Sequence, residues 1–230
     1  MRFFTSAIIA ASGNSTRMGL SYSKQLIDLN GKTVIEHTLT AFENCGLIDE
    51  IVVVCRDVDR DEIMAVASKF SKFKAVVKGG DTRDRSVMNG VKACSENAQF
   101  FAIHDGARPL VTTDEIEAVV TRAYETKAAT LGTFVTDTIK VVNDKNEIQS
   151  TPKRDTLRAV QTPQVFEKEL YLRAIENAVK NNLCVTDDCS MVEALCEKVE
   201  VVLGSAQNIK LTTVTDIVFA KAILDERNNS

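Results

Sequence analysis

Short apolar segments alternate with amphipathic segments through the first half of the chain. Ile51–Cys55 is a continuous apolar run, typical of strands that are buried on both faces of a parallel sheet. Similar runs are Ala7–Ala10, Ala75–Val77 and Phe100–Ile103. Between these runs the apolar residues recur at helical spacing, which predicts helices over 34–45, 63–70, 83–94 and 112–127. This order predicts an α/β fold with a doubly wound, mostly parallel sheet and right-handed crossovers.

Two of the predicted helix ends carry capping residues. Gly46 follows the helix over 34–45 and is interpreted as its C-terminal cap. Thr112 and Glu115 have the spacing of a capping box, which predicts that a helix begins there.

The pattern changes in the second half of the chain. Asp137–Val142 and Glu147–Ser150 flank a polar turn, which predicts a β-hairpin. Because a hairpin has no natural place in a parallel sheet, we expect an arm over about 134–157 that needs a partner surface. The rest of the pattern predicts helices over 170–179, from about 186 and over 213–226, and strands at 200–203 and 208–211. Without repeats or linkers, the sequence predicts a single domain over residues 1–230 with one arm.

The loop after the first predicted strand has the character of a phosphate site. Ala10 to Gly13 have very small side chains, so backbone N–H groups can approach a bound anion closely. Arg17 and Lys24 follow and add cationic donors. Neither the P-loop nor the dinucleotide glycine pattern fits this loop. The alternative is a polar loop after an edge strand, with both cations merely solvated.

Polar residues follow three of the predicted strands, at Ser12–Lys24, Gly79–Ser86 and His104–Arg108. Ligands of open α/β sheets bind beyond the carboxyl ends of the strands, so we expect these loops to share one site. Asp105 could hold Mg²⁺ against a triphosphate there, or could simply cap the turn that follows it. His104 is interpreted as structural. Lys210 lies within an apolar strand pattern, which favours a functional role over a surface charge.

Composition limits the classes of function. The 230 residues carry a net charge of −4, which argues against general affinity for nucleic acid. The six cysteines form no CxxC pair and are typical of a reducing cytosol. The sequence has neither a signal segment nor a long apolar run, so we expect a cytoplasmic protein that does not bind membranes.

Short motifs occur in a fixed order along nearly the whole chain. They are Ala10-Ala11-Ser12-Gly13, Arg17-Met18-Gly19, Lys24-Gln25, Gly79-Gly80-Asp81 with Arg83 and Ser86-Val87, His104 to Pro109, Asp137-Thr138, Thr162-Pro163-Gln164, Thr186-Asp187-Asp188 with Ser190, and Asn208-Ile209-Lys210 with Thr212. Each motif is weak alone, but their order is specific. Together they resemble the 2-C-methyl-D-erythritol 4-phosphate cytidylyltransferase family of the non-mevalonate isoprenoid pathway.

The resemblance implies a Rossmann-like fold of nucleotidyltransferase type and a set of site residues. The reaction would transfer CMP from CTP to 2-C-methyl-D-erythritol 4-phosphate, a polyol phosphate, and release pyrophosphate. Asp105 would hold Mg²⁺ or another divalent cation. The implied catalytic residues are Arg17, Lys24 and Lys210. The implied nucleotide-binding residues are Ala10, Ala11, Gly13, Gly80, Asp81 and Ser86. The implied residues for the acceptor are Arg108, Thr138, Arg154, Thr162 and Thr186. Of these, Thr138 and Arg154 would come from the partner in a homodimer with exchanged arms.

Three positions depart from the family pattern. Ser12 stands where the family usually has Gly, so the loop would be strained if this position needed a positive φ. Ser23 replaces a usual Pro, which loosens the loop before Lys24. Val214 replaces a usual Pro at the start of a helix.

Three alternative functions remain. A ribitol 5-phosphate cytidylyltransferase shares Lys24-Gln25, Thr162–Gln164 and Asn208–Lys210, but Ala10–Gly13 and Asp105–Pro109 favour the methylerythritol enzyme. A nicotinamide oxidoreductase lacks its glycine fingerprint here. A non-catalytic nucleotide-binding protein would not need the cations that meet the leaving group.

Overall fold

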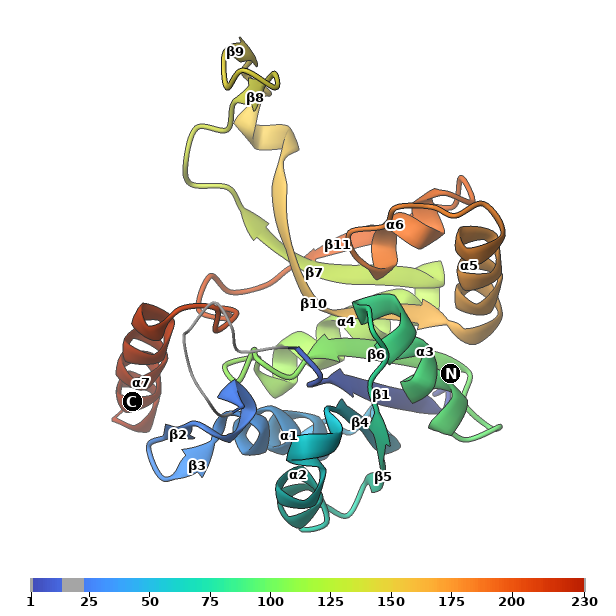
Figure 1. The fold of residues 1–230 in the computed structure, drawn as a ribbon, viewed down its shortest axis with the longest axis vertical. Coiled ribbons are helices and arrows are strands. Elements are labelled where there is room, and N and C mark those ends of the chain that lie inside the picture. The colour runs from blue at the N-terminus through green and yellow to red at the C-terminus, as the bar shows by residue number, and fades with distance from the viewer. Residues whose placement is uncertain (1, 14–22, 230) are drawn as a thin grey trace.

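A central sheet of seven strands organises the structure, a computed structural model that describes residues 2–13 and 23–229 (Figure 1). The spatial order of the strands is β11-β7-β10-β6-β1-β4-β5. Their bounds are Thr5–Ala10 (β1), Glu50–Cys55 (β4), Phe73–Lys78 (β5), Phe100–Asp105 (β6), Ala128–Phe134 (β7), Arg158–Glu167 (β10) and Glu200–Leu203 (β11). β1 lies between β4 and β6 and is parallel to both, which confirms the core of the predicted parallel sheet.

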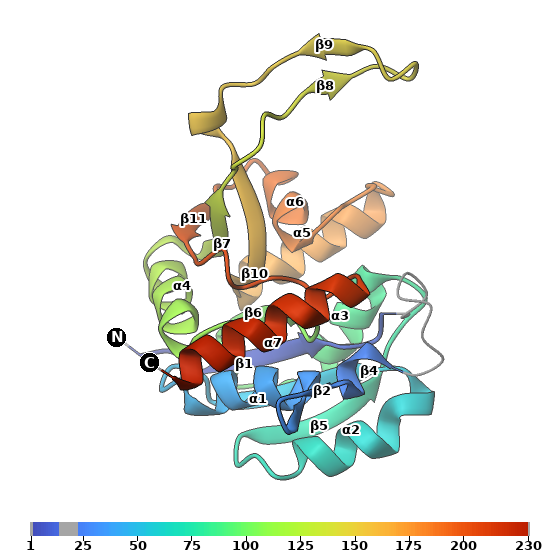
Figure 2. The same cartoon turned by 90° about the vertical axis from the view of Figure 1, so that its left-hand side faces the viewer.

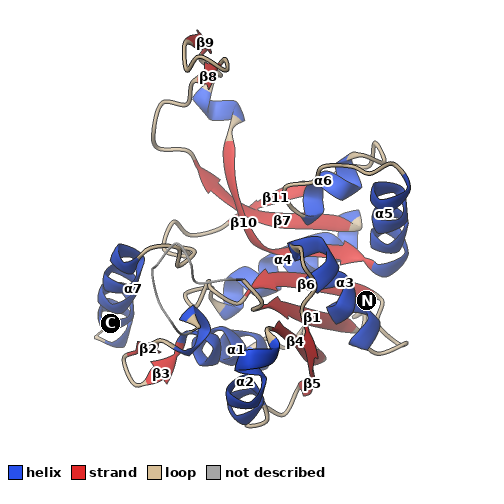
Figure 3. Ribbon diagram, viewed as in Figure 1, coloured by secondary structure: helices blue, strands red, loops and turns tan. Residues whose placement is uncertain are grey.

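Helices cover both faces of this sheet, as Figure 3 shows. They are α1 (Val34–Asn44), α2 (Arg60–Ala67), α3 (Arg83–Ala93), α4 (Thr113–Thr126), α5 (Lys168–Lys180), α6 (Asp188–Glu193) and α7 (Val214–Asn228). Successive strand residues point to opposite faces. Ile9 therefore belongs to the core formed with α1, α2 and α4, and Ile8 to the core formed with α3, α5 and α6. The doubly wound α/β prediction is confirmed.

The strands β7 and β10 were missed by the sequence pattern. β10 runs antiparallel to both β6 and β7, and its register shifts between Val160 and Gln164. This irregular stretch contains Pro163, whose missing N–H weakens any strand pattern. The sheet is therefore mostly parallel with one antiparallel strand.

The predicted hairpin projects from the body as an arm (Figure 2). Its strands β8 (Val141–Val142) and β9 (Ile148–Ser150) pair antiparallel. The hairpin projects for a different reason than the one expected from the sequence: the arm continues the antiparallel pair β7 and β10 and does not interrupt a parallel sheet. The arm carries exposed apolar side chains, and Ile148 is 65 % exposed.

Two local predictions are wrong and one is confirmed. Gly46 does not cap α1, which ends at Asn44 with Cys45 in extended conformation at its C-cap. The segment 208–211 is not a strand, since the backbone N–H of Leu211 donates to the carbonyl oxygen of Ala107, which belongs to a loop. The capping box of Thr112 and Glu115 is present at the start of α4.

Small elements complete the described chain. Two short strands, β2 (Asp28–Leu29) and β3 (Lys32–Thr33), precede α1. Short 3₁₀ helices are η2 (Lys24–Leu26), η3 (Asp57–Asp59) and η4 (Arg154–Thr156). None of the helices in residues 2–13 and 23–229 has the length and apolar character needed to cross a membrane.

Candidate active site

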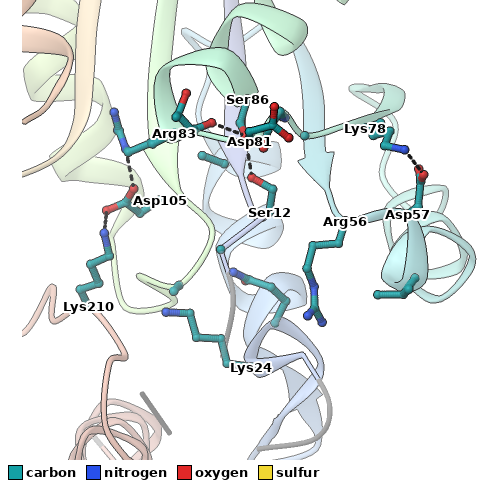
Figure 4. A pocket seen from close by; sticks show the side chains of 18 residues that line it. Ser12, Lys24, Arg56, Asp57, Lys78, Asp81, Arg83, Ser86, Asp105 and Lys210 are labelled. Atoms are coloured by element: carbon teal, nitrogen blue, oxygen red, sulfur yellow. Dashed lines mark hydrogen bonds and ion pairs between the residues drawn. The ribbon is translucent and has the colours of Figure 1, made fainter. Parts of the chain in front are cut away.

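A cavity of about 740 Å³ opens at the carboxyl ends of β1, β4, β5 and β6 (Figure 4). All three loops predicted to share one site contribute to its lining, which confirms that prediction for the described residues. The lining residues are Ala10, Ser12, Gly13, Lys24, Gln25, Arg56, Asp57, Val58, Lys78, Gly79, Gly80, Asp81, Thr82, Arg83, Ser86, Asp105, Ala107 and Lys210.

The loops after β1 and β5 touch each other at the cavity wall. Ser12 Oγ donates to Ser86 Oγ at 3.0 Å, and the N–H of Gly80 also donates to Ser86 Oγ at 3.0 Å. A Cβ atom on Gly79 would lie 2.5 Å from the Cβ of Ser12, so only glycine fits where the loops cross. Ser12 is not among the described residues with positive φ, and the strain that its replacement of Gly could cause is absent.

Lys24 reaches the cavity from the short helix η2. Ser23 caps this helix by accepting the N–H of Gln25, with a φ of −68° that a proline would also adopt. Lys24 is largely buried, and its Nζ donates to the carbonyl oxygen of Leu211 at 2.9 Å. The lysine therefore joins η2 to the segment that carries Lys210. Arg17 lies outside the described residues.

Asp105 ends β6 and stands among three cations. Its Oδ2 lies 2.7 Å from Lys210 Nζ, its Oδ1 lies 3.5 Å from Arg83 Nε, and Arg108 Nε lies 3.7 Å from Oδ2. Burial acts to raise the pKa of the Asp105 carboxyl, but Lys210, Arg83 and Arg108 together hold it well below its usual range. Asp105 is therefore ionised at neutral pH.

His104 is fully buried behind Asp105 and plays the structural part expected of it. Its Nε2 lies 3.2 Å from the carbonyl oxygen of Arg108, and its Nδ1 lies 3.0 Å from Thr162 Oγ1. Burial lowers the pKa of His104 to about 4, so the imidazole is neutral at physiological pH. It fixes the turn after β6 against β10.

The residues expected for the acceptor fall into two groups. Arg108 and Thr162 adjoin Asp105: Arg108 Nη1 donates to the carbonyl oxygen of Asn208 at 2.7 Å, and Thr162 Oγ1 accepts from the N–H of Asp105 at 3.1 Å. Thr186 is exposed just before α6.

The second group lies on the arm, where Arg154 Nη2 donates to Thr138 Oγ1 at 3.0 Å. Neither Thr138 nor Arg154 lines the cavity formed by the described residues of the same chain. The two side chains are therefore placed together, but apart from the rest of the site.

Three cations of the cavity were not assigned a role from the sequence. Arg56 directly follows β4, Lys78 is the last residue of β5, and Arg83 begins α3. Arg56 forms two hydrogen bonds to Asp59, of 2.7 and 2.8 Å, and Lys78 pairs with Asp57. The positions of Arg56 and Lys78 at the carboxyl ends of strands are the signal that could have found these two residues.

The arrangement suits a polyphosphate. Cationic side chains approach the cavity from separate elements, and the small residues of the first loop allow close backbone contact. The ionised carboxylate of Asp105 lies among them and matches the oxygen ligands that Mg²⁺ prefers when phosphates complete its shell.

Comparison with known proteins agrees with this chemistry. The family described as 2-C-methyl-D-erythritol 4-phosphate cytidylyltransferase (IspD) matches residues 5–226. The chain belongs to this family. Its members are cytidylyltransferases by name, and the match favours the methylerythritol reading over the ribitol phosphate alternative.

Individual relatives match over nearly their full length. A protein of Desulforamulus reducens and one of Caldanaerobacter subterraneus, both named 2-C-methyl-D-erythritol 4-phosphate cytidylyltransferase, are 42% and 43% identical to this chain. The first match covers 96% of each chain, and the second covers 95% of this chain and 98% of the relative.

A solved structure shares the fold. The crystal structure of 4-diphosphocytidyl-2C-methyl-D-erythritol synthase from Anaerococcus prevotii superposes with a TM-score of 0.87 at 34% identity, covering 97% of this chain and 99% of that one. The Rossmann-like nucleotidyltransferase fold is therefore confirmed.

Proposed function

We propose that this chain transfers CMP from CTP to 2-C-methyl-D-erythritol 4-phosphate, forming 4-diphosphocytidyl-2-C-methyl-D-erythritol and pyrophosphate. The observation that carries the proposal is the convergence of Lys24, Arg83 and Lys210 on one cavity that also holds the carboxylate of Asp105. Family membership supports the choice of both substrates.

The reaction is an in-line displacement. An oxygen of the acceptor phosphate attacks the α-phosphorus of CTP, and the bond to the β,γ-pyrophosphate breaks. The residues act by positioning and charge neutralisation, and no covalent enzyme intermediate is needed. Lys24 reaches the cavity from η2, and Lys210 reaches it from the segment before α7. Together with Arg17, these two lysines would bind the phosphates.

The nucleotide would occupy the part of the cavity between the first loop and the N-terminus of α3. Ala10, Gly13 and Gly80 line this part with little side-chain bulk, and Asp81 and Ser86 add polar groups. Ala11 is buried directly beside them. This combination supports close contact between the backbone and the nucleotide.

Mg²⁺ is part of the proposal, with Asp105 as its protein ligand. The carboxylate suits a hard cation because it is ionised and lines the cavity. Lys210 pairs with its Oδ2, whereas its Oδ1 lies 3.5 Å from Arg83 Nε. Bound there, Mg²⁺ would neutralise charge on the phosphate oxygens of CTP.

We also propose a homodimer with exchanged arms. An isolated two-stranded hairpin is marginally stable in water, and this arm exposes Ile139, Val141, Val142 and Ile148. A partner surface would bury these side chains. The arm would carry Thr138 and Arg154 to the acceptor phosphate in the partner's cavity, near Arg108, Thr162 and Thr186.

The cytoplasm is the proposed site of action. All six cysteines are free thiols, which is the state expected in a reducing compartment.

Release of pyrophosphate, measured with a panel of substrates, tests the proposal. The expected result is turnover of CTP with 2-C-methyl-D-erythritol 4-phosphate and Mg²⁺. Equal or faster turnover of ribitol 5-phosphate would move the chain to the alternative activity. Turnover of ATP or GTP in place of CTP would reject the assignment of the nucleotide.

A further inference from the structure

Arg83 lies between two carboxylates at the back of the cavity. Its Nη1 donates to Asp188 Oδ2 at 2.6 Å, whereas its Nε is 3.5 Å from Asp105 Oδ1 (Figure 4 shows the latter pair). Asp188 therefore holds the guanidinium more closely than Asp105 does. A guanidinium has five N–H donors, and the one hydrogen bond that Arg83 forms within the described residues uses a single donor.

Asp188 is itself fixed from behind. The residue is fully buried at the start of α6, where Tyr171 OH donates to its Oδ1 at 2.6 Å. Its backbone N–H donates to Oε1 of Gln164, a β10 residue, at 3.1 Å. Tyr171 is also fully buried, and its ring stacks on Phe166 with 5.1 Å between centroids. Asp188 is therefore held by contacts that do not depend on Arg83.

A buried ion pair of this kind is not expected to contribute much to the net stability of the fold. The cost of desolvating both charges can exceed their attraction, and apolar side chains of similar size often stabilise a core as well or better. Here the pair ends at the cavity wall, and Asp188 begins α6 only two residues after Thr186, an expected acceptor ligand. This placement indicates a role in the reaction.

We propose that Asp188 is a positioning residue, which acts through Arg83 and is supported by Tyr171. It holds the guanidinium at the cavity wall to meet the phosphates of the nucleotide, and prevents it from closing on Asp105. The inference rests on the proposed function. It adds Arg83 to the groups that contact the substrate, and it links the segment before α6, which carries Thr186, to the nucleotide end of the cavity.

A double-mutant cycle in turnover tests the proposal. Asp188→Asn removes the charge with little change in shape, and it should lower kcat about 10²-fold, as expected for a misplaced substrate-contacting group. In an Arg83→Ala background the same substitution should leave kcat unchanged within about threefold, because its route of action is already lost. Equal losses in both backgrounds would indicate a merely structural role and overturn the proposal, as would normal kcat for Asp188→Asn.

Two further variants keep the test decisive. Glu50→Gln also removes a buried carboxylate that has a lysine partner, Lys74, but it lies at the amino end of β4, away from the cavity. Its kcat should match that of the unmodified protein.

Tyr171→Phe keeps the stacked ring and loses only the hydroxyl, so this variant replaces Asp188→Asn in the test if Asp188→Asn does not fold. A folded Tyr171→Phe protein should lose about tenfold in kcat, and only when Arg83 is present; normal kcat would overturn the proposal.

Calorimetric titration with inorganic pyrophosphate and Mg²⁺ separates this inference from the proposed function. If the unmodified protein transfers CMP to none of the acceptor phosphates in the panel, the proposed function is wrong. The positioning role is then supported by an approximately tenfold weaker pyrophosphate affinity in Asp188→Asn that disappears in the Arg83→Ala background. Unchanged affinity in Asp188→Asn would overturn it.

Discussion

Lys210 Nζ lies 2.7 Å from Asp105 Oδ2, although the two residues are far apart in the sequence. The contact depends on the extended segment before α7. Leu211 fixes this segment on both sides: its N–H donates to the carbonyl oxygen of Ala107, and its own carbonyl oxygen accepts from Lys24 Nζ. The turn after β6, the helix η2 and the segment before α7 thus meet at Leu211.

Asp216 secures the other end of this segment. Its Oδ2 accepts from the N–H groups of Thr212 and Thr213, each at 2.7 Å. Asp216→Ala should lower the free energy of unfolding by about 1–2 kcal/mol, because it leaves these donors without their acceptor. It should also lower kcat, since Lys210 loses its anchor. Glu176→Ala, an exposed helix position, is the control for both measurements.

The stabilisation by Asp216 depends on pH. Burial acts to raise the pKa of its carboxyl, but the hydrogen bonds from Thr212 and Thr213 lower it below the ordinary value of 3.8. A depressed pKa in the folded state gives a contribution that is fully present above about pH 5 and is lost as the pH falls through the folded pKa. Urea unfolding of the unmodified protein and Asp216→Ala should therefore differ at neutral pH and converge in acid. A constant difference over that range would contradict this account.

Lys24 is predicted to act on the phosphates rather than only to brace Leu211. Lys24→Ala should lower kcat by about 10²–10³-fold, as for the loss of a donor to charge that develops in the transition state. Lys92→Ala, an exposed lysine of α3, should leave kcat unchanged. Steady-state kinetics that show a raised KM with a preserved kcat would assign Lys24 to substrate binding alone.

The crossing of the first loop with the loop after β5 predicts an unusual rescue. Gly79→Ala should cost about 1–3 kcal/mol of stability and impair CTP binding, because its Cβ would lie 2.5 Å from the Cβ of Ser12. Ser12→Gly removes the opposing atom and should restore most of both losses. Thermal unfolding and CTP titration of the two single variants and the double variant measure this. Additive losses in the double variant would show that the two positions do not compete for space.

The body of the fold was predictable from apolar runs and helical spacing, because β1, β4 and β6 are buried on both faces and carry polar residues only at their ends. β10 could not be found in this way. Its buried part contains Gln161, Thr162 and Gln164, whose side chains bond to distant segments such as Asn208 and α6. The hydrogen bonds of these polar side chains are made to residues far away in the sequence, so they leave no local sequence pattern that predicts a strand.

The candidate site was predictable to the extent that its residues follow strand ends. The ion pair between Arg83 and Asp188 was not predictable. It depends on α6 lying near α3, and this arrangement follows from the antiparallel pairing of β10 with β6, which the sequence pattern did not reveal. The segment around Lys210 was read as a strand because of its apolar alternation, but its apolar residues pack against α7 and the turn after β6 instead.

The exchanged arm predicts complementation between two inactive variants. In the proposed dimer, Lys24→Ala damages the body of a subunit, whereas Arg154→Ala damages the arm that would serve its partner. In a mixed dimer both lesions fall in one site and the other site is intact. With random reassortment about half of the dimers are mixed, so refolding the variants together should restore about a quarter of the activity. No recovery, with dimers confirmed by sedimentation, would place Arg154 in its own subunit's site.

The transfer of CMP to the acceptor phosphate is tested most directly by isotope labelling. 2-C-methyl-D-erythritol 4-phosphate labelled with ¹⁸O in its phosphate is incubated with CTP and Mg²⁺, and the products are analysed by mass spectrometry. Attack by the acceptor oxygen on the α-phosphorus predicts that all the label stays in 4-diphosphocytidyl-2-C-methyl-D-erythritol and that the pyrophosphate carries none. Label in the pyrophosphate, or no labelled CDP-alcohol at all, would contradict the proposed reaction.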